Sequence, residues 1–212
     1  MDLLLLQLAD SAFPAGAFAH SSGLEALRHL GLLSGEQALV LRLEELAWHT
    51  AHSALPFLGE AFERDAVAAD RACDAFLSNH VGNRASRAQG RAFLLAAEAT
   101  FGEAVTPLRA ALPCAHLAVA AGASLRAANV PLDDAREVFL FGAVRNALSA
   151  AVRLGATGPL RAQRLLFELH PTLRRALAET RGLGAGAACT TAPWLELAQG
   201  AHDRLYSRLF QS

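Results

Sequence analysis

Glu45, His49 and His52 form the first group of residues whose types and spacing could support chemistry. They recur at i, i+4 and i+7, so a helix would align one carboxylate and two imidazoles on one face. Such side chains are the ligands that Zn²⁺ takes in proteins. The sequence therefore allows a small helical metalloprotein or metal-dependent enzyme, and a plain polar helix face beside Trp48 is the competing interpretation.

Two further groups contain histidine but indicate no catalyst. His202 and Asp203 resemble half of a metal-dependent phosphohydrolase pair without its other members, so we expect a solvated pair on the last helix. His20 and Ser21 are neighbours, and a base adjacent in sequence to its nucleophile seldom approaches it correctly. The chain has no G-x-S-x-G, P-loop or H-E-x-x-H motif. We therefore expect a protein that is not an enzyme, with no catalytic residue, cofactor or metal ligand.

Composition narrows the possible partners. The 212 residues are 53% hydrophobic and only 18% charged, with 19 basic and 20 acidic residues and a net charge of −1. That balance gives no electrostatic basis for binding nucleic acid or an anionic membrane. Because monomers seldom expose large apolar patches, we expect a partner protein to cover part of the surface.

The cysteines and the first residues bear on location. Cys73, Cys114 and Cys189 are odd in number and far apart, which predicts no disulfide framework and favours the reducing cytoplasm. The apolar run at 3–6 is short, lacks a basic flank and soon meets Asp10. It is therefore predicted to be neither a signal peptide nor a membrane span.

The elements that must position these residues are predicted to be helices throughout. Long stretches rich in Ala, Leu, Arg and Glu are interrupted by Gly and Pro, which indicates a compact all-α protein of about ten helices in a single domain, 1–212. Serines with an acid or amide three residues later, at Ser22 and Ser34, have capping-box spacing. The predicted helices span 22–30, 35–52, 54–68, 70–81, 84–101, 114–128, 131–154, 159–180 and 193–206, with a short one between Pro107 and Pro113.

Glycine and proline set finer expectations. Gly155 can supply a left-handed helix stop, and Gly122 is expected to permit close packing. Pro171 removes a backbone donor, so the helix over 159–180 should kink or break near it. The glycine-rich segment 182–190 is predicted to be a flexible linker.

The segment 206–212, Tyr-Ser-Arg-Leu-Phe-Gln-Ser, combines two aromatics, a leucine and an arginine where polar residues are usual. These are the residue types that dominate protein interfaces, since they join a large buried area to a directed polar tip. We therefore expect segment 206–212 to be a docking tail that packs on the chain itself or on a partner.

Taken with this tail, three other segments resemble the UreF family of urease accessory proteins over essentially the whole chain. They are 5–25, 148–160 and 197–203. The resemblance implies an all-helical, non-enzymatic assembly factor, expected to be a homodimer. It would bind the accessory protein UreD, called UreH in some species, and recruit the GTPase UreG, so that nickel enters apo-urease.

The resemblance also assigns residues. Arg208 would fix the tail through its guanidinium. Phe18 stands where some relatives have Tyr, so if Arg208 packs there only a ring-face contact would remain. Gln211 replaces an arginine that is common in the family. The residues expected to bind partners are Phe18, His20, Glu25, Tyr206, Ser207, Arg208, Leu209 and Phe210.

Two internal motifs of the family are expected to be structural. One contains Ser86 and Gly90 and is interpreted as a close helix crossing or a partner surface, and the other, with Arg153 and Pro159, as a turn. The expected mechanism is that the tail and the N-terminal motif, residues 13–25, become ordered on partner contact and create a surface for the next component.

Overall fold

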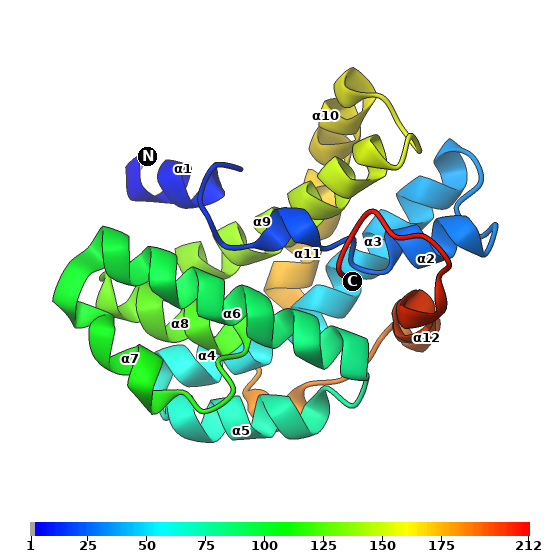
Figure 1. Ribbon diagram of the computed structural model, residues 1–212. Helices are drawn as coiled ribbons and strands as arrows, with labels where there is room; N and C mark the ends of the chain where they lie inside the picture. Colours follow the sequence, from blue (N-terminus) through cyan, green and yellow to red (C-terminus); the bar gives the residue numbers. More distant parts are fainter. Residues whose placement is uncertain (1–2) are drawn as a thin grey trace.

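The computed structural model describes residues 3–212, in which every regular element is helical, so the all-α prediction is confirmed (Figure 1). Within these residues there are twelve α-helices, because an unpredicted helix precedes the N-terminal motif and the helix expected over 159–180 is two. The α-helices are α1 (Leu3–Ala9), α2 (Leu24–His29), α3 (Glu36–Ser53), α4 (Leu55–Glu63), α5 (Ala66–Phe76), α6 (His80–Phe101), α7 (Thr106–Ala111), α8 (Leu117–Ala127), α9 (Leu132–Arg153), α10 (Pro159–Glu168), α11 (His170–Glu179) and α12 (Pro193–Gly200). Short 3-10 segments lie at Ala17–Ala19, Gly102–Ala104, Ala185–Ala187 and Ala201–Arg204.

Helix α8 is the centre of the core and packs between α4 and α6 (Figure 1). All eight residues from 118 to 125 are buried. A Cβ at Gly122 would lie 2.3 Å from the carbonyl oxygen of Leu58, and one at Gly90 would lie 1.9 Å from that of Ala115. Glycine therefore allows α8 and its leading loop to contact both neighbours, which confirms the close packing expected at Gly122 and Gly90.

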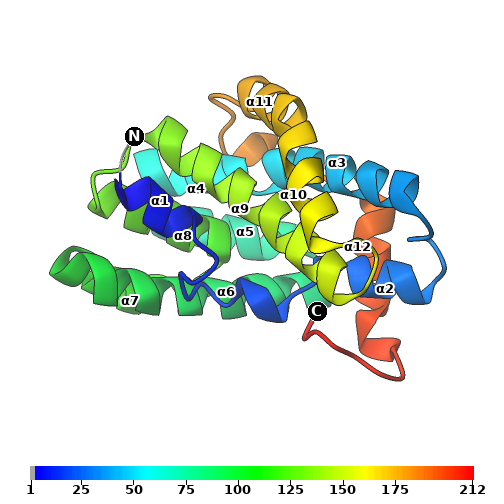
Figure 2. The ribbon, with the colours of Figure 1, turned by 90° about the horizontal axis from the view of Figure 1, so that it is seen from above.

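Helix α9 is the second long core element and contacts α1, α3, α8 and α10 (Figure 2). It ends as predicted, with Gly155 in the left-handed region at φ 68°. Helices α10 and α11 both have proline at their first or second position, and Leu169 separates them. The break expected at Pro171 is therefore confirmed.

Several predicted boundaries are wrong because side-chain caps set them. The helices expected over 54–68 and 70–81 are α4 and α5. Helix α4 ends at Glu63, five residues before the expected position. Asp65 starts α5 by accepting from the amides of the second and third residues after it. Asn79 does the same for α6, which begins four residues before the expected position of 84.

The two predicted capping boxes are also wrong. Gly23 and Gly35 are the N-cap residues of α2 and α3, and neither helix has a side-chain cap. Ser22 has φ 53°, and the carboxylate of Glu25 is directed away from the helix end toward the C-terminal segment. The sequence pattern thus located both helices by the wrong mechanism.

The C-terminal segment differs from the expected single helix over 193–206. Helix α12 ends at Gly200, a 3-10 turn follows to Arg204, and Leu205 has an extended conformation. The segment 182–190 lies against the body of the protein: the Ala185 amide donates to Glu60 Oε2 at 3.3 Å, and the Cys189 amide donates to the His52 carbonyl at 3.1 Å.

Candidate functional site

The C-terminal tail lies on the N-terminal motif, with backbone bonds along its last residues. The Gln211 amide donates to the carbonyl of Ala19 at 2.8 Å, and the Ser21 amide donates to the backbone oxygen of Ser212 at 2.6 Å. The Ser21 hydroxyl reaches the same oxygen at 3.0 Å. His20 Nδ1 lies 2.6 Å from Ser212 Oγ. The His20–Ser21 pair that resembles a catalytic fragment therefore binds the tail.

Glu25 binds the tail from below and is almost completely buried. Its Oε1 accepts from the Leu209 amide at 2.5 Å, and its Oε2 accepts from the Phe210 amide at 3.2 Å. His202 Nε2 lies 2.9 Å from the same Oε2. The expectation of a solvated pair at His202 and Asp203 is wrong for His202, whose side chain has no exposed surface.

Arg153 also contacts both the tail and the N-terminal motif, and we call the region where these two segments meet the junction. Its guanidinium lies over the Phe18 ring at 3.8 Å and over the Phe210 ring at 4.2 Å. Its Nη1 also donates to the Phe18 carbonyl at 2.5 Å. Phe18 does have a ring-face contact with an arginine, but Arg153 provides it, whereas Arg208 pairs with Asp203 at 3.3 Å. The turn role assigned to Arg153 is therefore incomplete.

The eight predicted partner-binding residues divide into a buried and an exposed set. His20, Glu25 and Phe210 are buried and hold the junction together. The exposed set contains large apolar side chains: Phe18 is 71% exposed, Leu209 55% and Tyr206 fully exposed. Ser207 and Arg208 are exposed beside them. We call Phe18, Tyr206, Ser207, Arg208 and Leu209 the tail surface.

Burial sets the charge of the histidine in the junction. It lowers the pKa of His20, and the nearby His202 lowers that pKa further. The imidazole of His20 is therefore neutral near pH 7, which matches its contact with an uncharged hydroxyl.

The group Glu45, His49 and His52 does not gather as a metal site, since these donor atoms do not meet within 4.8 Å among the described residues. Glu45 instead pairs with Arg42 at 2.7 Å, and His52 Nδ1 contacts the Trp48 carbonyl at 3.0 Å. His49 is largely buried 3.6 Å from Glu196. Glu45, His49 and His52 therefore make separate contacts along the polar face of α3 beside Trp48.

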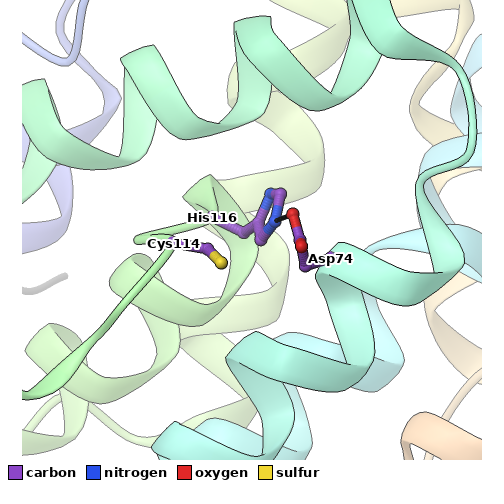
Figure 3. A group of neighbouring side chains, drawn as sticks. All are labelled: Asp74, Cys114 and His116. Atoms are coloured by element: carbon purple, nitrogen blue, oxygen red, sulfur yellow. Dashed lines mark hydrogen bonds and ion pairs between the residues drawn. The ribbon is translucent and has the colours of Figure 1, made fainter.

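A different group of potential ligands was not found from the sequence. Asp74 on α5 points toward His116 and contacts it, and Cys114 lies on the same loop as His116 (Figure 3). Burial lowers the pKa of His116 and raises that of Cys114, so the imidazole and the thiol are both neutral near pH 7. The short Cys-x-His spacing was the available signal, but Asp74 lies 42 residues before His116.

A large cavity lies beneath the N-terminal motif. Its volume is about 1000 Å³, and its lining includes Phe13, Phe93, Leu125 and Phe139. The lining is mainly apolar and also includes the charged residues Asp10, Arg145, Arg153 and Glu196. None of the described helices is both long and apolar enough to cross a membrane.

Comparison with known proteins identifies the family. The UreF family model matches residues 33–170. Urease accessory protein F of Arabidopsis thaliana is 32% identical, with 97% of this chain and 90% of that protein covered. The protein of the same name from Oryza sativa subsp. japonica is 30% identical, covering 96% and 82%. Urease accessory protein UreF of Paenarthrobacter aurescens (strain TC1) is 32% identical, covering 99% and 97%. The chain therefore belongs to the UreF family.

Proposed function

We propose that this chain is a non-enzymatic assembly factor for urease maturation that bridges UreD (UreH) and the GTPase UreG, so that nickel can be inserted into apo-urease. Its family membership supports the role in urease maturation. The observation that carries the bridging role is the tail surface, which the contacts of Glu25 and Arg153 present to solvent.

The composition of the tail surface suits a protein partner. Tyr206 has no buried area within this chain, and Phe18 and Leu209 also expose more than half of their surface. Aromatic side chains and arginine account for much of the binding energy at protein interfaces. We assign the tail surface to UreD, and the complex so formed then presents the site for UreG.

The proposed assembly is a homodimer of this chain with UreD and UreG, in the cytoplasm. All three cysteines are free, as a reducing compartment maintains them. The balance of 19 basic and 20 acidic residues supports protein partners over nucleic acid or membrane.

Size-exclusion chromatography with light scattering tests the proposal. The wild-type chain, mixed with UreD and UreG, should elute in one ternary peak, and alone it should show twice its mass of 22.4 kDa. Tyr206→Ala and Arg208→Ala should weaken the ternary peak without unfolding the chain, because neither side chain is in the core.

Arg181→Ala is the matched control. Arg181 is an exposed arginine that pairs with Asp133 at 2.9 Å, much as Arg208 pairs with Asp203. Asp133 lies at the start of α9 and Arg153 at its end, about 30 Å apart at 1.5 Å per residue. Loss of the complex in the control as well would remove the tail surface from the interface, and no complex with well-folded wild type would reject the bridging role.

A further inference from the structure

Asp74, Cys114 and His116 bring an oxygen, a sulfur and a nitrogen donor within 4.8 Å of one another (Figure 3). His116 Nε2 lies 3.1 Å from Asp74 Oδ1, and the imidazole has no exposed surface. Asp74 is partly exposed, so water can reach this group from one side. No residue of this group belongs to the tail surface or to the buried junction beneath it.

Asp70 fixes the loop that supplies two of the donors. Its buried carboxylate accepts from the backbone amides of Cys114, Ala115 and His116, at 2.7, 2.9 and 2.9 Å. Ala115 is held in the left-handed region at φ 58°, and Gly90 leaves the space that its carbonyl occupies. The thiol and the imidazole are therefore placed on a rigid loop, as a preorganised ligand site requires.

Neighbouring polar groups orient the donors. The ionised Asp74 carboxylate can only accept, so in the ion-free chain His116 Nε2 donates to Asp74 Oδ1, and Nδ1 accepts from Ser86 Oγ at 3.1 Å. If the proton moves to Nδ1, Ser86 Oγ can accept from it, and the Nε2 lone pair becomes free for an ion. Asn83 Nδ2 donates to Asp74 Oδ1 at 3.0 Å. Metal-binding histidines and carboxylates commonly have such outer hydrogen bonds, which fix the tautomer and the orientation of the ligand.

We propose that Asp74, Cys114 and His116 bind a divalent transition-metal ion of the Zn²⁺ class. A thiolate and an imidazole select zinc-like ions, whereas Mg²⁺ and Ca²⁺ prefer oxygen ligands alone. Bonds of about 2.1 Å in a tetrahedral site place neighbouring ligand atoms about 3.4 Å apart. The His116–Asp74 separation of 3.1 Å is already close to that value, and the Cys114 sulfur lies within 4.8 Å of both atoms.

The charges and protons of this binding step balance. The thiol of Cys114 loses its proton to solvent, and the imidazole proton moves from Nε2 to Nδ1 beside Ser86, so the imidazole stays neutral and Nε2 can bind the ion. A thiolate and the Asp74 carboxylate then neutralise a divalent ion, which a partly buried site favours. Water fills the fourth position, because the described residues supply three ligands.

The positive charge of Arg87 would repel a bound cation. Its Nη1 lies 3.8 Å from Asp74 Oδ1, and its side chain is 36% exposed. Because a long exposed side chain can move into solvent, Arg87 is expected to leave Asp74 when the ion binds. Removing its charge with Arg87→Gln should therefore tighten binding.

The test uses the full chain, treated with a chelator and then titrated with Co²⁺ as a spectroscopic substitute for Zn²⁺. We expect one equivalent to bind with a thiolate-to-cobalt charge-transfer band that added Zn²⁺ removes. Cys114→Ser should abolish the band, and Asp74→Asn should weaken binding. Ser86→Ala should weaken Zn²⁺ binding about tenfold, through the orientation of the imidazole.

Cys189→Ser is the matched control, because Cys189 is an exposed free thiol outside the group. It should retain both the band and the affinity, and circular dichroism should show that every variant is folded. A folded wild type without the band, or an unchanged band in Cys114→Ser, would overturn the metal site. This result is independent of partner binding, so it leaves the role in urease maturation untouched.

Discussion

The carboxylate of Glu25 and the imidazole of His202 meet 2.9 Å apart in the interior, although 177 residues separate them. The same carboxylate accepts from the amides of Leu209 and Phe210. One buried side chain of α2 therefore connects the N-terminal motif, the turn after α12 and the tail. The tail surface depends on this connection for its position.

Glu25→Gln should loosen the tail. It replaces one acceptor oxygen by a donor, so at least one of the three donors at the carboxylate loses its partner. A hydrogen bond to a charged group contributes about 1.5–3 kcal/mol. Hydrogen exchange at Leu209 and Phe210 should therefore accelerate by roughly tenfold or more. Glu137→Gln, on the exposed side of α9, is the control and should change nothing there. Unchanged exchange in Glu25→Gln would contradict the role of this carboxylate.

Arg153→Ala should release the tail from α9. The guanidinium lies over two rings and donates to a carbonyl, and a cation–π contact contributes about 0.5–2 kcal/mol depending on its exposure. We expect faster hydrogen exchange across residues 206–212. Arg153→Lys keeps the positive charge but loses the planar group that stacks on the two rings, so it should also speed the exchange, by less than Arg153→Ala. Arg164→Ala, at an arginine whose side chain is 75% exposed, provides the control. Equal exchange in both alanine variants would mean that Arg153 does not hold the tail.

Gly90→Ala and Gly142→Ala should have opposite effects, although both glycines lie within long helices. A Cβ at Gly90 would overlap the Ala115 carbonyl, whereas one at Gly142 meets nothing within 4 Å. Overpacking costs about 1–3 kcal/mol, and alanine in an open helical position gains up to about 1 kcal/mol over glycine. Urea unfolding, followed by the fluorescence of Trp48 and Trp194, measures both changes. A stable Gly90→Ala variant would show that the loop at Ala115 can move.

Acid should destabilise the protein through His49. Burial lowers the pKa of His49 to about 4, with a smaller contribution from His52. The unfolded state, with a histidine pKa near 6.5, then binds the proton first, so stability is lost as the pH falls from about 6.5 to about 4. The loss is about 3 kcal/mol at 1.36 kcal/mol per pKa unit, and Glu196 at 3.6 Å reduces it.

His49→Leu should remove much of this slope from the free energy of unfolding measured between pH 7 and pH 4. His29→Leu, at an exposed histidine, should keep it. The same slope in His49→Leu as in the wild type would assign the acid sensitivity to another group.

Helix existence was predictable from the sequence, and helix ends were less so. The Ala- and Leu-rich stretches have a period that persists over several turns, so α3 and α9 were placed within one or two residues. The boundaries at 63, 66 and 80 depended on whether Asp65 and Asn79 cap a helix, and polar residues of this kind are frequent throughout the chain. Helix α1 was missed because a short apolar run lacks a readable period.

The residues of the site were largely named in advance, but their contacts were not. The family resemblance singled out Glu25, Phe18 and the tail, whereas it gave no register between segments that are far apart. The sequence therefore predicted Arg153 to be part of a turn, and it predicted for Arg208 the contact with Phe18 that Arg153 makes in the structure. Asp74 was missed for the same reason, since only the fold brings it to the Cys114 loop.

The pairing of the tail with the N-terminal motif makes synthesis of residues 206–212 a condition for this surface. His20 and Ser212 are 192 residues apart, and closing so long a loop delays their contact until most of the chain is folded. During synthesis on the ribosome, the N-terminal motif is therefore not covered by the tail while the intervening helices are made. A product that stops before residue 205 has no tail to place over Glu25 and Arg153, so it cannot present the surface that a partner would recognise.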